Sequence, residues 1–596
     1  MLARTDSRAR ALVLCLVAVV AAGAIGARLV WWQVVQQPWL AAMAYQQLAQ
    51  VQDLPAERGE ITDRNGELLA TSVELQSIFA TPPSIEDPGL AAALLASVLE
   101  VPVDDLRKRI EGDRAWVWLE HRVSPEVAER IRELDLRGIG MLPETKRVYP
   151  VHGVADETTI AAQLIGFVDS SGEGRFGVEQ AEQTLLAGVA GEVTAQEDVI
   201  GRRIADSVTL LEEPVDGADL RLTIDAGVQY LLEKEMWASY QANSAVGVTG
   251  VIMNAETGAI LGMASFPSYD ANQFATTEGE RFANPAVARQ YEPGSVMKAI
   301  TIAAALDAGA ITTTDTFLDD NDLRIGKVRI QNADRYDHPY GHGEITAQEV
   351  LALSNNVGAA RIGLELGGAE LYEAFRRFGF GAPTGIALTG ETSGVIWDPN
   401  GPNASGDLTT AQNSFGQGLS LTAVQLVTGY ASFANGGNLV SPHVVAGWTD
   451  PDGTYHATDQ APPERIMREE TAATLAEMLT NAIDEGIANG AGIPGYTVAG
   501  KTGTAQIAGP VKVKNADGEM VERYQYIDGW VDSSFIGFLP VAETKLVTLI
   551  LIHRPAGAGG PRMPERPEWT YADLMPQVLD YLAIPPDRPS EPVAHP

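Results

Sequence analysis

The chain has 596 residues, 45% hydrophobic and 20% charged, a globular composition too long for one core that predicts two or three domains. Its formal net charge of −36 argues against a nucleic-acid partner, because binding phosphates requires a clustered basic surface. The single cysteine, Cys15, excludes a disulfide framework, a cysteine-based zinc site and a cysteine nucleophile in the rest of the chain.

The N-terminus combines three arginines, at positions 4, 8 and 10, with a long apolar run at 11–27. As a helix this run spans about 26 Å, and the following residues, which end in two tryptophans, bring it to bilayer thickness. Because basic residues favour the cytoplasmic side, we predict a cytoplasmic tail at 1–10, a transmembrane helix at 11–32 and an extracytoplasmic remainder. The alternative is a cleaved signal peptide, but the run is longer than a usual signal core.

Residues 33–215 are predicted to form a first domain beyond the membrane. Asn65-Gly66 lies between two short strand-like runs and indicates a hairpin, since a type I′ turn needs positive φ at both central positions. Ser124-Pro125 is typical of a helix start, with a capping serine before a proline in the first turn. The segment 212–225 reads as a linker that leads into a strand, so the main boundary is placed there.

From residue 226 onward the patterns change. A helical pattern at 226–243 is followed by a hairpin pattern at 246–265, many further helical patterns, and strand-like runs near the C-terminus. This order predicts an α+β domain at 220–580 whose sheet is built from both ends of the segment. The proline-rich segment 581–596 is predicted to be a disordered tail.

A serine and a lysine stand one helical turn apart directly after a Pro-Gly turn. Ser295 is placed at a helix start, where backbone N–H groups and the helix dipole stabilise developing negative charge. Lys298 lies at i+3, on the same face. A serine hydroxyl becomes a good nucleophile when a base takes its proton, and a lysine whose pKa is lowered can be that base. Alone, this pattern is more typical of a serine helix cap beside an exposed lysine.

Two further motifs raise the significance of this pair. Ser354-Asn355-Asn356 begins another helical pattern, and Lys501-Thr502-Gly503 lies in a strand-like run. The set S-x-x-K, S-x-N and K-T-G occurs in serine β-lactamases and penicillin-binding proteins. In such a group Ser354 can relay a proton between Lys298 and a leaving amine, and Asn356 can bond both Lys298 and a substrate amide.

The third motif suits recognition of a carboxylate. Lys501 supplies a cation, keeps Lys298 neutral by charge repulsion, and has Thr502 beside it as a hydrogen-bond donor. Gly503 leaves space for a substrate backbone along the strand edge. The N–H groups of Ser295 and Thr504 are candidates for an oxyanion hole.

At this point the sequence resembles class B penicillin-binding proteins, monofunctional peptidoglycan D,D-transpeptidases, over nearly its whole length. RGEITDRNGELLA (58–70) is similar to the family's first N-terminal motif, and 146–192 resembles the rest of its pedestal domain. The stretches 413–437, SFIGFLP (534–540) and LDYLAIPPD (579–587) resemble later family segments. The amino-acid sequences of these motifs resemble the division-type branch of the family more closely than the elongation-type branch.

The resemblance implies a membrane-anchored enzyme with an elongated pedestal at 33–215 and a transpeptidase domain at 220–580, whose mainly antiparallel sheet is flanked by helices. It implies catalytic roles for Ser295, Lys298, Ser354 and Asn356, and substrate binding by residues 501–504. The expected substrates are peptidoglycan stem peptides, with β-lactams as covalent inhibitors and no cofactor. The expected partners are a SEDS-type membrane glycosyltransferase and division proteins, in cell-wall and septum synthesis.

Three other functions fit the same residues. A β-lactam-binding hydrolase or sensor would send water to the acyl-enzyme, and a D,D-carboxypeptidase would hydrolyse the stem peptide. A non-catalytic scaffold would bind peptidoglycan or division partners without turnover. Two segments depart from the family pattern: 553–574 differs from the expected glycine-rich segment, and 507–532 is predicted to be a loop beside the cleft.

Two clusters of metal-binding residue types were weighed as metal sites. His338 and His342, with Asp334 and Asp337, are separated by a Pro-Tyr-Gly turn and so do not share a helical face as in H-E-x-x-H. We expect a polar loop near the cleft and no metal. The run LDDNDLR (318–324) lacks the glycine and final glutamate of an EF-hand and is expected to be a solvated turn.

Overall fold

The computed structural model describes residues 7–37, 39, 49–112, 114–196, 209–402, 404–514, 520–540, 546–556 and 566–588. The chain divides into two compact units, and three stretches contribute to each. Unit 1 comprises Met1–Glu57, Leu75–Glu144 and Gly188–Asp216, and unit 2 comprises Arg58–Glu74, Thr145–Ala187 and Gly217–Pro596. The segment predicted as one pedestal domain, 33–215, is therefore shared between both units.

The N-terminal helix is confirmed. Helix α1 (Ser7–Val30) continues as a π-helical turn, Trp31–Val35. The stretch Arg10–Val35 has a mean hydropathy of 2.4, and none of its most apolar window is buried against protein. Its length and hydropathy suit a single-pass membrane anchor.

Unit 1 contains a small antiparallel sheet and a helical subdomain. The sheet has the order β1 (Ala49–Leu54), β8 (Gly191–Gln196) and β9 (Thr209–Glu212). In the subdomain, Ser124 accepts a hydrogen bond from Val127 N–H and Pro125 is the first helical residue, as predicted. A buried cluster that includes Ile78, Leu95, Leu106, Leu119 and Ile131 joins α3 (Pro88–Leu99), α4 (Val103–Ile110), α5 (Pro125–Glu133) and strands β3 (Leu68–Ala80), β4 (Val117–Val123) and β5 (Ile139–Val148).

The hairpin predicted at Asn65-Gly66 is confirmed, but its turn type is not. Strands β2 (Ile61–Thr62) and β3 pair antiparallel, and Gly66 has a φ of 92°. Asn65 does not have a positive φ. Instead, its backbone N–H donates to Asp63 Oδ1 at 2.7 Å. The aspartate side chain thus closes a longer turn that does not require two left-handed residues.

Unit 2 is built on a five-stranded sheet in which every neighbouring pair is antiparallel, as predicted. Its middle strand comes from near the C-terminus and lies between strands from both ends of the segment. The strand order is β12 (Ile260–Phe266), β11 (Gly247–Asn254), β23 (Leu546–His553), β22 (Met520–Leu539) and β21 (Ala499–Lys514).

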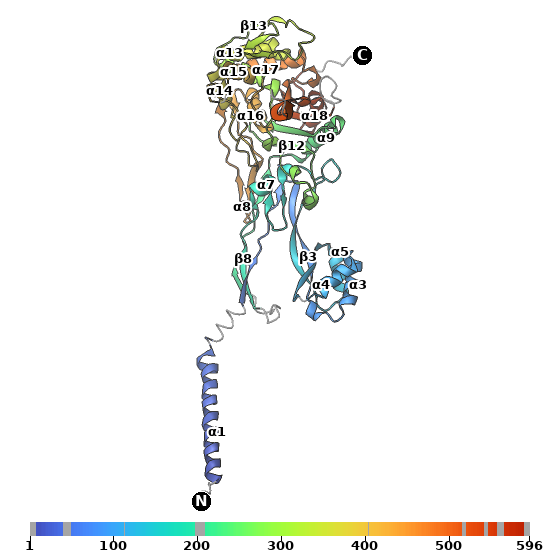
Figure 1. Cartoon of the computed structure of the whole chain (residues 1–596), viewed down its shortest axis with the longest axis vertical. Helices are drawn as coiled ribbons and strands as arrows, with labels where there is room; N and C mark the ends of the chain where they lie inside the picture. Colours follow the sequence, from blue (N-terminus) through green and yellow to red (C-terminus); the bar gives the residue numbers. More distant parts are fainter. Residues whose placement is uncertain are drawn as a thin grey trace. The chain divides into compact units, whose positions relative to one another are not determined.

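Both faces of this sheet are buried, because successive side chains point to opposite faces and are mostly apolar in the central strands β11 and β23. Ile550 belongs to the buried cluster shared with α9 (Ala226–Asn243) and α18 (Pro567–Tyr581), which lie together (Figure 1). Leu549 belongs to the cluster on the other face, with α11 (Met297–Asp307) and α16 (Ala423–Ala434). Helix α11 is therefore a core helix, which fixes the position of the residues at its start.

The remaining elements of unit 2 are short or surround this core. The helices are α6 (Ala162–Ile165), α7 (Gly177–Ala181), α8 (Gln183–Leu186), α10 (Pro285–Ala288), α12 (Ala347–Ala352), α13 (Asn356–Leu366), α14 (Gly368–Arg377), α15 (Asp407–Ser414) and α17 (Glu469–Asp484). The strands are β6 (Phe167–Val168), β7 (Gly174–Arg175), β10 (Asp219–Leu222), β13 (Thr316–Asp319), β14 (Leu323–Ile325), β15 (Val328–Ile330), β16 (Gly343–Thr346), β17 (Asn438–Leu439), β18 (Val445–Thr449), β19 (Tyr455–Ala457) and β20 (Glu464–Arg465).

Two predictions for the C-terminal part are corrected. Within the segment 507–532, predicted as a loop, residues 507–514 and 520–532 instead continue β21 and β22 and pair antiparallel out to Lys514 and Met520; residues 515–519 lie outside the described residues. In the tail predicted to be disordered at 581–596, Arg588 forms an ion pair with Asp484 and so contacts the rest of unit 2. Residues 589–596 lie outside the described residues.

Candidate active site

Ser295 lies in a 3-10 turn, Gly294–Val296, that runs directly into α11. The turn needs a glycine at position 294 because its φ is 61° and a Cβ there would meet the Thr504 carbonyl oxygen at 3.0 Å. Buried Tyr430 stabilises the turn by donating a hydrogen bond from its hydroxyl group to Val296 O at 2.7 Å. Ser295 is thus held between the start of a buried helix and strand β21.

Lys298 contacts Ser295, as their i, i+3 spacing on a helix predicts. Its Nζ lies 2.9 Å from Ser295 Oγ and 3.2 Å from Ser354 Oγ, and it also donates to the Ser354 carbonyl oxygen. The lysine is fully buried. Burial, together with the positive charge of Lys501, lowers the pKa of Lys298 well below its usual range, which is the direction that a lysine acting as a base requires.

Ser354 connects the two lysines. It stands between α12 and α13 with a φ of 54°, a left-handed conformation that is uncommon for a residue other than glycine. Its Oγ accepts a hydrogen bond from Lys501 Nζ at 2.9 Å as well as the one from Lys298. This geometry gives a continuous path of hydrogen bonds from Ser295 to Lys501.

The K-T-G residues lie on β21, at the edge of the sheet. Lys501 is fully buried, and burial lowers its pKa to about 7 although Glu568 opposes the shift. A Cβ on Gly503 would lie 2.5 Å from Ser534 Oγ and 2.9 Å from the Pro293 carbonyl oxygen. The glycine is therefore required by packing within the protein, in addition to any space that it leaves for a substrate.

Asn356 differs from its predicted contact. Its side-chain amide donates to Gln331 O at 2.9 Å, and among the described residues no hydrogen bond joins it to Lys298. Its backbone N–H donates to Asn332 Oδ1, also at 2.9 Å. The asparagine is thus held by the segment that follows β15.

Sequence analysis missed the residue that organises this segment, Asp319. It was assigned to a solvated turn but is fully buried, as is Asn321. The Asp319 carboxylate accepts hydrogen bonds from Asn332 Nδ2 at 2.8 Å, Asn355 Nδ2 at 2.7 Å and His342 N–H at 2.9 Å. Although burial acts in the opposite direction, these donors hold the pKa of Asp319 below its usual range. No local pattern marks one buried aspartate among several acidic neighbours.

These residues surround one cavity of about 420 Å³. It is lined by residues of all three motifs and by the segment that follows β15, including Ser295, Asp334, His338, His342, Ser354, Asn356, Thr502 and Thr504. The predicted nucleophile Ser295, the predicted proton-relay residue Ser354 and the predicted carboxylate ligand Thr502 therefore face one space, which suits attack on a carbonyl beside a carboxylate. Among the metal-ligand side chains at this cavity, those of Asp334, His338 and His342 lie close enough together to share one metal ion.

Comparison with known proteins identifies two domain families. Residues 248–565 match the penicillin binding protein transpeptidase domain, and residues 53–222 match the penicillin-binding protein dimerisation domain. The first match contains the three motifs, and the second begins just before the hairpin of β2 and β3.

Several curated proteins are similar over most of their length. Stage V sporulation protein D of Bacillus subtilis is 31% identical over 557 residues, covering 92% of this chain and 82% of that protein. Peptidoglycan D,D-transpeptidase FtsI of Escherichia coli is 30% identical over 536 residues, covering 89% and 84%. The probable peptidoglycan D,D-transpeptidase PbpC of Pseudomonas aeruginosa is 31% identical over 580 residues, covering 96% and 94%.

Solved structures share the fold. Penicillin binding protein 3 of Mycobacterium tuberculosis, complexed with aztreonam, has a TM-score of 0.66 at 24% identity, covering 91% of this chain and 99% of that one. Penicillin binding protein 2X of Streptococcus thermophilus has a TM-score of 0.72 at 20% identity, covering 90% and 80%.

Proposed function

Because the chain belongs to the penicillin-binding protein transpeptidase family, we propose that it is a serine D,D-transpeptidase that cross-links peptidoglycan stem peptides. The relatives named as peptidoglycan D,D-transpeptidases support the substrate class. The observation that carries the proposal is the position of buried Lys298 Nζ within hydrogen-bonding distance of both Ser295 Oγ and Ser354 Oγ.

In the first half-reaction, Ser295 Oγ bonds to the carbonyl carbon between the two D-alanines of a stem peptide while neutral Lys298 accepts the hydroxyl proton. The C–N bond then breaks. The leaving nitrogen takes a proton from Ser354 Oγ, which regains one from Lys298. Terminal D-alanine departs and an ester to Ser295 remains.

In the second half-reaction, an amine of a neighbouring stem attacks the ester carbonyl. The amine loses its proton to Lys298, a new amide bond forms, and Ser295 Oγ regains a proton as the ester bond breaks. Lys501 and Thr502 act earlier, in the first half-reaction, by binding the terminal carboxylate of the donor stem, which then leaves with D-alanine. Asn356 contacts the amide of the donor stem, and in both half-reactions the N–H groups of Ser295 and Thr504 stabilise the oxyanion. A β-lactam would acylate Ser295 by the same first step.

We further propose that α1 anchors the enzyme with its N-terminus in the cytoplasm and its catalytic unit outside, as the arginines before the helix favour. A role in septum formation, with a SEDS-type glycosyltransferase and division proteins as partners, follows from the resemblance and from FtsI among the relatives.

The test is intact-mass spectrometry of the full-length protein in detergent after addition of benzylpenicillin, followed over hours. We expect one adduct with the mass of whole penicillin, because opening the lactam ring releases no leaving group. The adduct should map to Ser295, persist for hours, be absent from Ser295→Ala and be retained in the control Ser405→Ala, which changes an exposed serine.

The other outcomes distinguish the alternatives. A transient adduct with consumption of penicillin would indicate a hydrolase, and release of D-alanine from a stem peptide without cross-linking would indicate a carboxypeptidase. The absence of any adduct would favour the scaffold, and an adduct that survives in Ser295→Ala would contradict the assignment of the nucleophile.

A further inference from the structure

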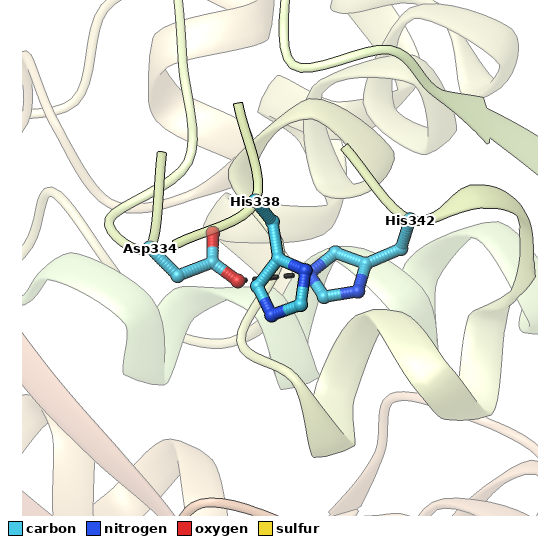
Figure 2. Close-up of side chains that lie close together, drawn as sticks. All are labelled: Asp334, His338 and His342. Atoms are coloured by element: carbon cyan, nitrogen blue, oxygen red, sulfur yellow. Dashed lines mark hydrogen bonds and ion pairs between the residues drawn. The ribbon is translucent and has the colours of Figure 1, made fainter. Parts of the chain in front are cut away.

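Three side chains with metal-ligand chemistry meet at the rim of the active-site cavity, and the proposed transpeptidase reaction uses none of them. Asp334, His338 and His342 lie on the segment that joins β15 to β16. Their side chains point toward one another, with the two imidazole rings next to each other at a tilt and the Asp334 carboxylate beside them (Figure 2). Their candidate ligand atoms all lie within 4.8 Å of one another.

The backbone brings the three together without a helix. His338 N–H donates to Asp334 O at 2.9 Å, which places these two residues one turn apart on the same side. Gly341 then reverses the chain with a φ of 74°, and its N–H donates to His338 O at 3.0 Å. The Pro-Tyr-Gly turn, which sequence analysis took as evidence against a metal site, is therefore what returns His342 to His338.

The surrounding fold fixes both histidines. The backbone N–H of His342 donates to buried Asp319 at 2.9 Å, and the carbonyl oxygen of His338 accepts a hydrogen bond from Asn321 Nδ2 at 3.1 Å. Because these anchors are buried, binding a ligand at this point requires little ordering of the backbone.

We propose that Asp334, His338 and His342 bind a divalent transition-metal ion, with Zn²⁺ the best match. Bonds of 2.0–2.2 Å at tetrahedral angles separate ligand atoms by about 3.3 Å. His342 Nε2 and Asp334 Oδ2 lie 2.8 Å apart, and the ring centres of His338 and His342 lie 4.2 Å apart. Small side-chain rotations therefore reach the required geometry. Two imidazoles with one carboxylate suit Zn²⁺ and leave its fourth position open to the cavity.

An ordinary ion pair between a histidine and an aspartate explains the contacts among these three side chains less well than a shared metal ion does. His456 and Asp450 form such a pair elsewhere in unit 2, at 2.7 Å, without a second imidazole. In the proposed site the ring of His338 lies against His342, and among the described residues no hydrogen bond reaches its nitrogens. A cation that both rings coordinate accounts for their close approach beside one carboxylate.

Zinc binding to the full-length protein in detergent tests the site. The protein is purified without a polyhistidine tag, stripped with a chelator, dialysed against Zn²⁺ and measured by inductively coupled plasma mass spectrometry, with affinity taken from competition with a chromophoric chelator. We expect one zinc per chain, bound at least about tenfold more weakly by His338→Gln and by His342→Gln. The matched control His456→Gln should bind like the unaltered protein.

His338→Gln is the decisive variant, because its ring is exposed and the change should not disturb folding. Co²⁺ substitution gives a second readout: visible absorption bands typical of a tetrahedral site should appear and be lost in this variant. Binding of less than one equivalent, or an affinity that His338→Gln leaves unchanged, would overturn the proposal. Since neither readout depends on acylation of Ser295, failure of the proposed reaction would be seen separately.

Discussion

At the scale of single residues, the active site depends on two buried lysines that share one serine hydroxyl. Lys298 and Lys501 both lie next to Ser354 Oγ, and two ammonium groups at this spacing in a dry site repel each other strongly. One lysine must therefore lose its proton first. Lys298 is the one whose pKa is lowered most clearly, by burial and by the charge of Lys501. In the proposed mechanism, the pair thus supplies a base and retains a cation at one site.

This division of roles predicts a pH dependence for acylation by penicillin. The pKa of Lys501 is about 7, so its charge, and with it the attraction for the penicillin carboxylate, is present below that pH and lost above it. The second-order rate constant reports the free enzyme and should fall as pH rises through about 7. Lys501→Arg keeps its charge and should abolish this alkaline decline, which stopped-flow measurements between about pH 5 and 9 would reveal.

The exposed Lys327 provides the control, since Lys327→Arg should keep the decline of the unaltered enzyme. A rate constant for the unaltered enzyme that stays constant up to about pH 9 would show that Lys501 keeps its proton there, contrary to the prediction.

At the scale of elements, the site depends on a connection that the motifs do not contain. Asp319, at the end of β13, accepts hydrogen bonds from Asn332, Asn355 and His342. The side chain of Asn332 in turn accepts hydrogen bonds from the backbone N–H groups of Asn356 and Val357. One buried carboxylate therefore sets the position of the S-x-N turn from outside it.

Replacing this carboxylate should disturb both stability and the reaction. In Asp319→Asn, at least one side-chain N–H would face a donor inside the protein, which costs about 1–3 kcal/mol of unfolding free energy and displaces Ser354 and Asn356. Because the pKa of Asp319 is lowered by folding, its contribution is present above its unfolded value and lost as pH falls through the folded value. We expect a lower melting temperature and slower penicillin acylation.

The neighbouring Asp320 is exposed, so Asp320→Asn serves as the matched control and should change stability by less than about 0.5 kcal/mol. If Asp319→Asn melted and acylated like this control, the proposed positioning role of Asp319 would be wrong.

The same elements show what sequence can predict. The spacing of Ser295 and Lys298 is local, so helical geometry alone predicted their contact correctly. The link from Asp319 to Asn355 crosses 36 positions and depends on how β13 and α13 pack, which no local pattern encodes. The hairpin of β21 and β22 was missed because its strands pair mostly with each other beyond the sheet, where alternation with a buried face gives no signal.

At the scale of the whole molecule, the anchor and the active site belong to different units. Helix α1 lies in the stretch Met1–Glu57 of unit 1, whereas Ser295, Lys298, Ser354 and Lys501 all lie in unit 2. Acylation therefore needs no residue from the membrane segment, and the tie to the membrane and the chemistry should be separable.

Deleting residues 1–48 tests this separation. Without the apolar helix the protein should move from the membrane fraction to the soluble fraction, since no other helix among the described residues is long and apolar enough to span a bilayer. Penicillin acylation of the truncated chain in detergent should stay within about twofold of the full-length rate, because every group in the proposed proton path is retained. A truncated chain that is soluble and monodisperse but no longer acylated would show that the membrane segment shapes the active site. In that case catalysis would be coupled to the membrane through the protein itself, and the lysine pair would not suffice to explain it.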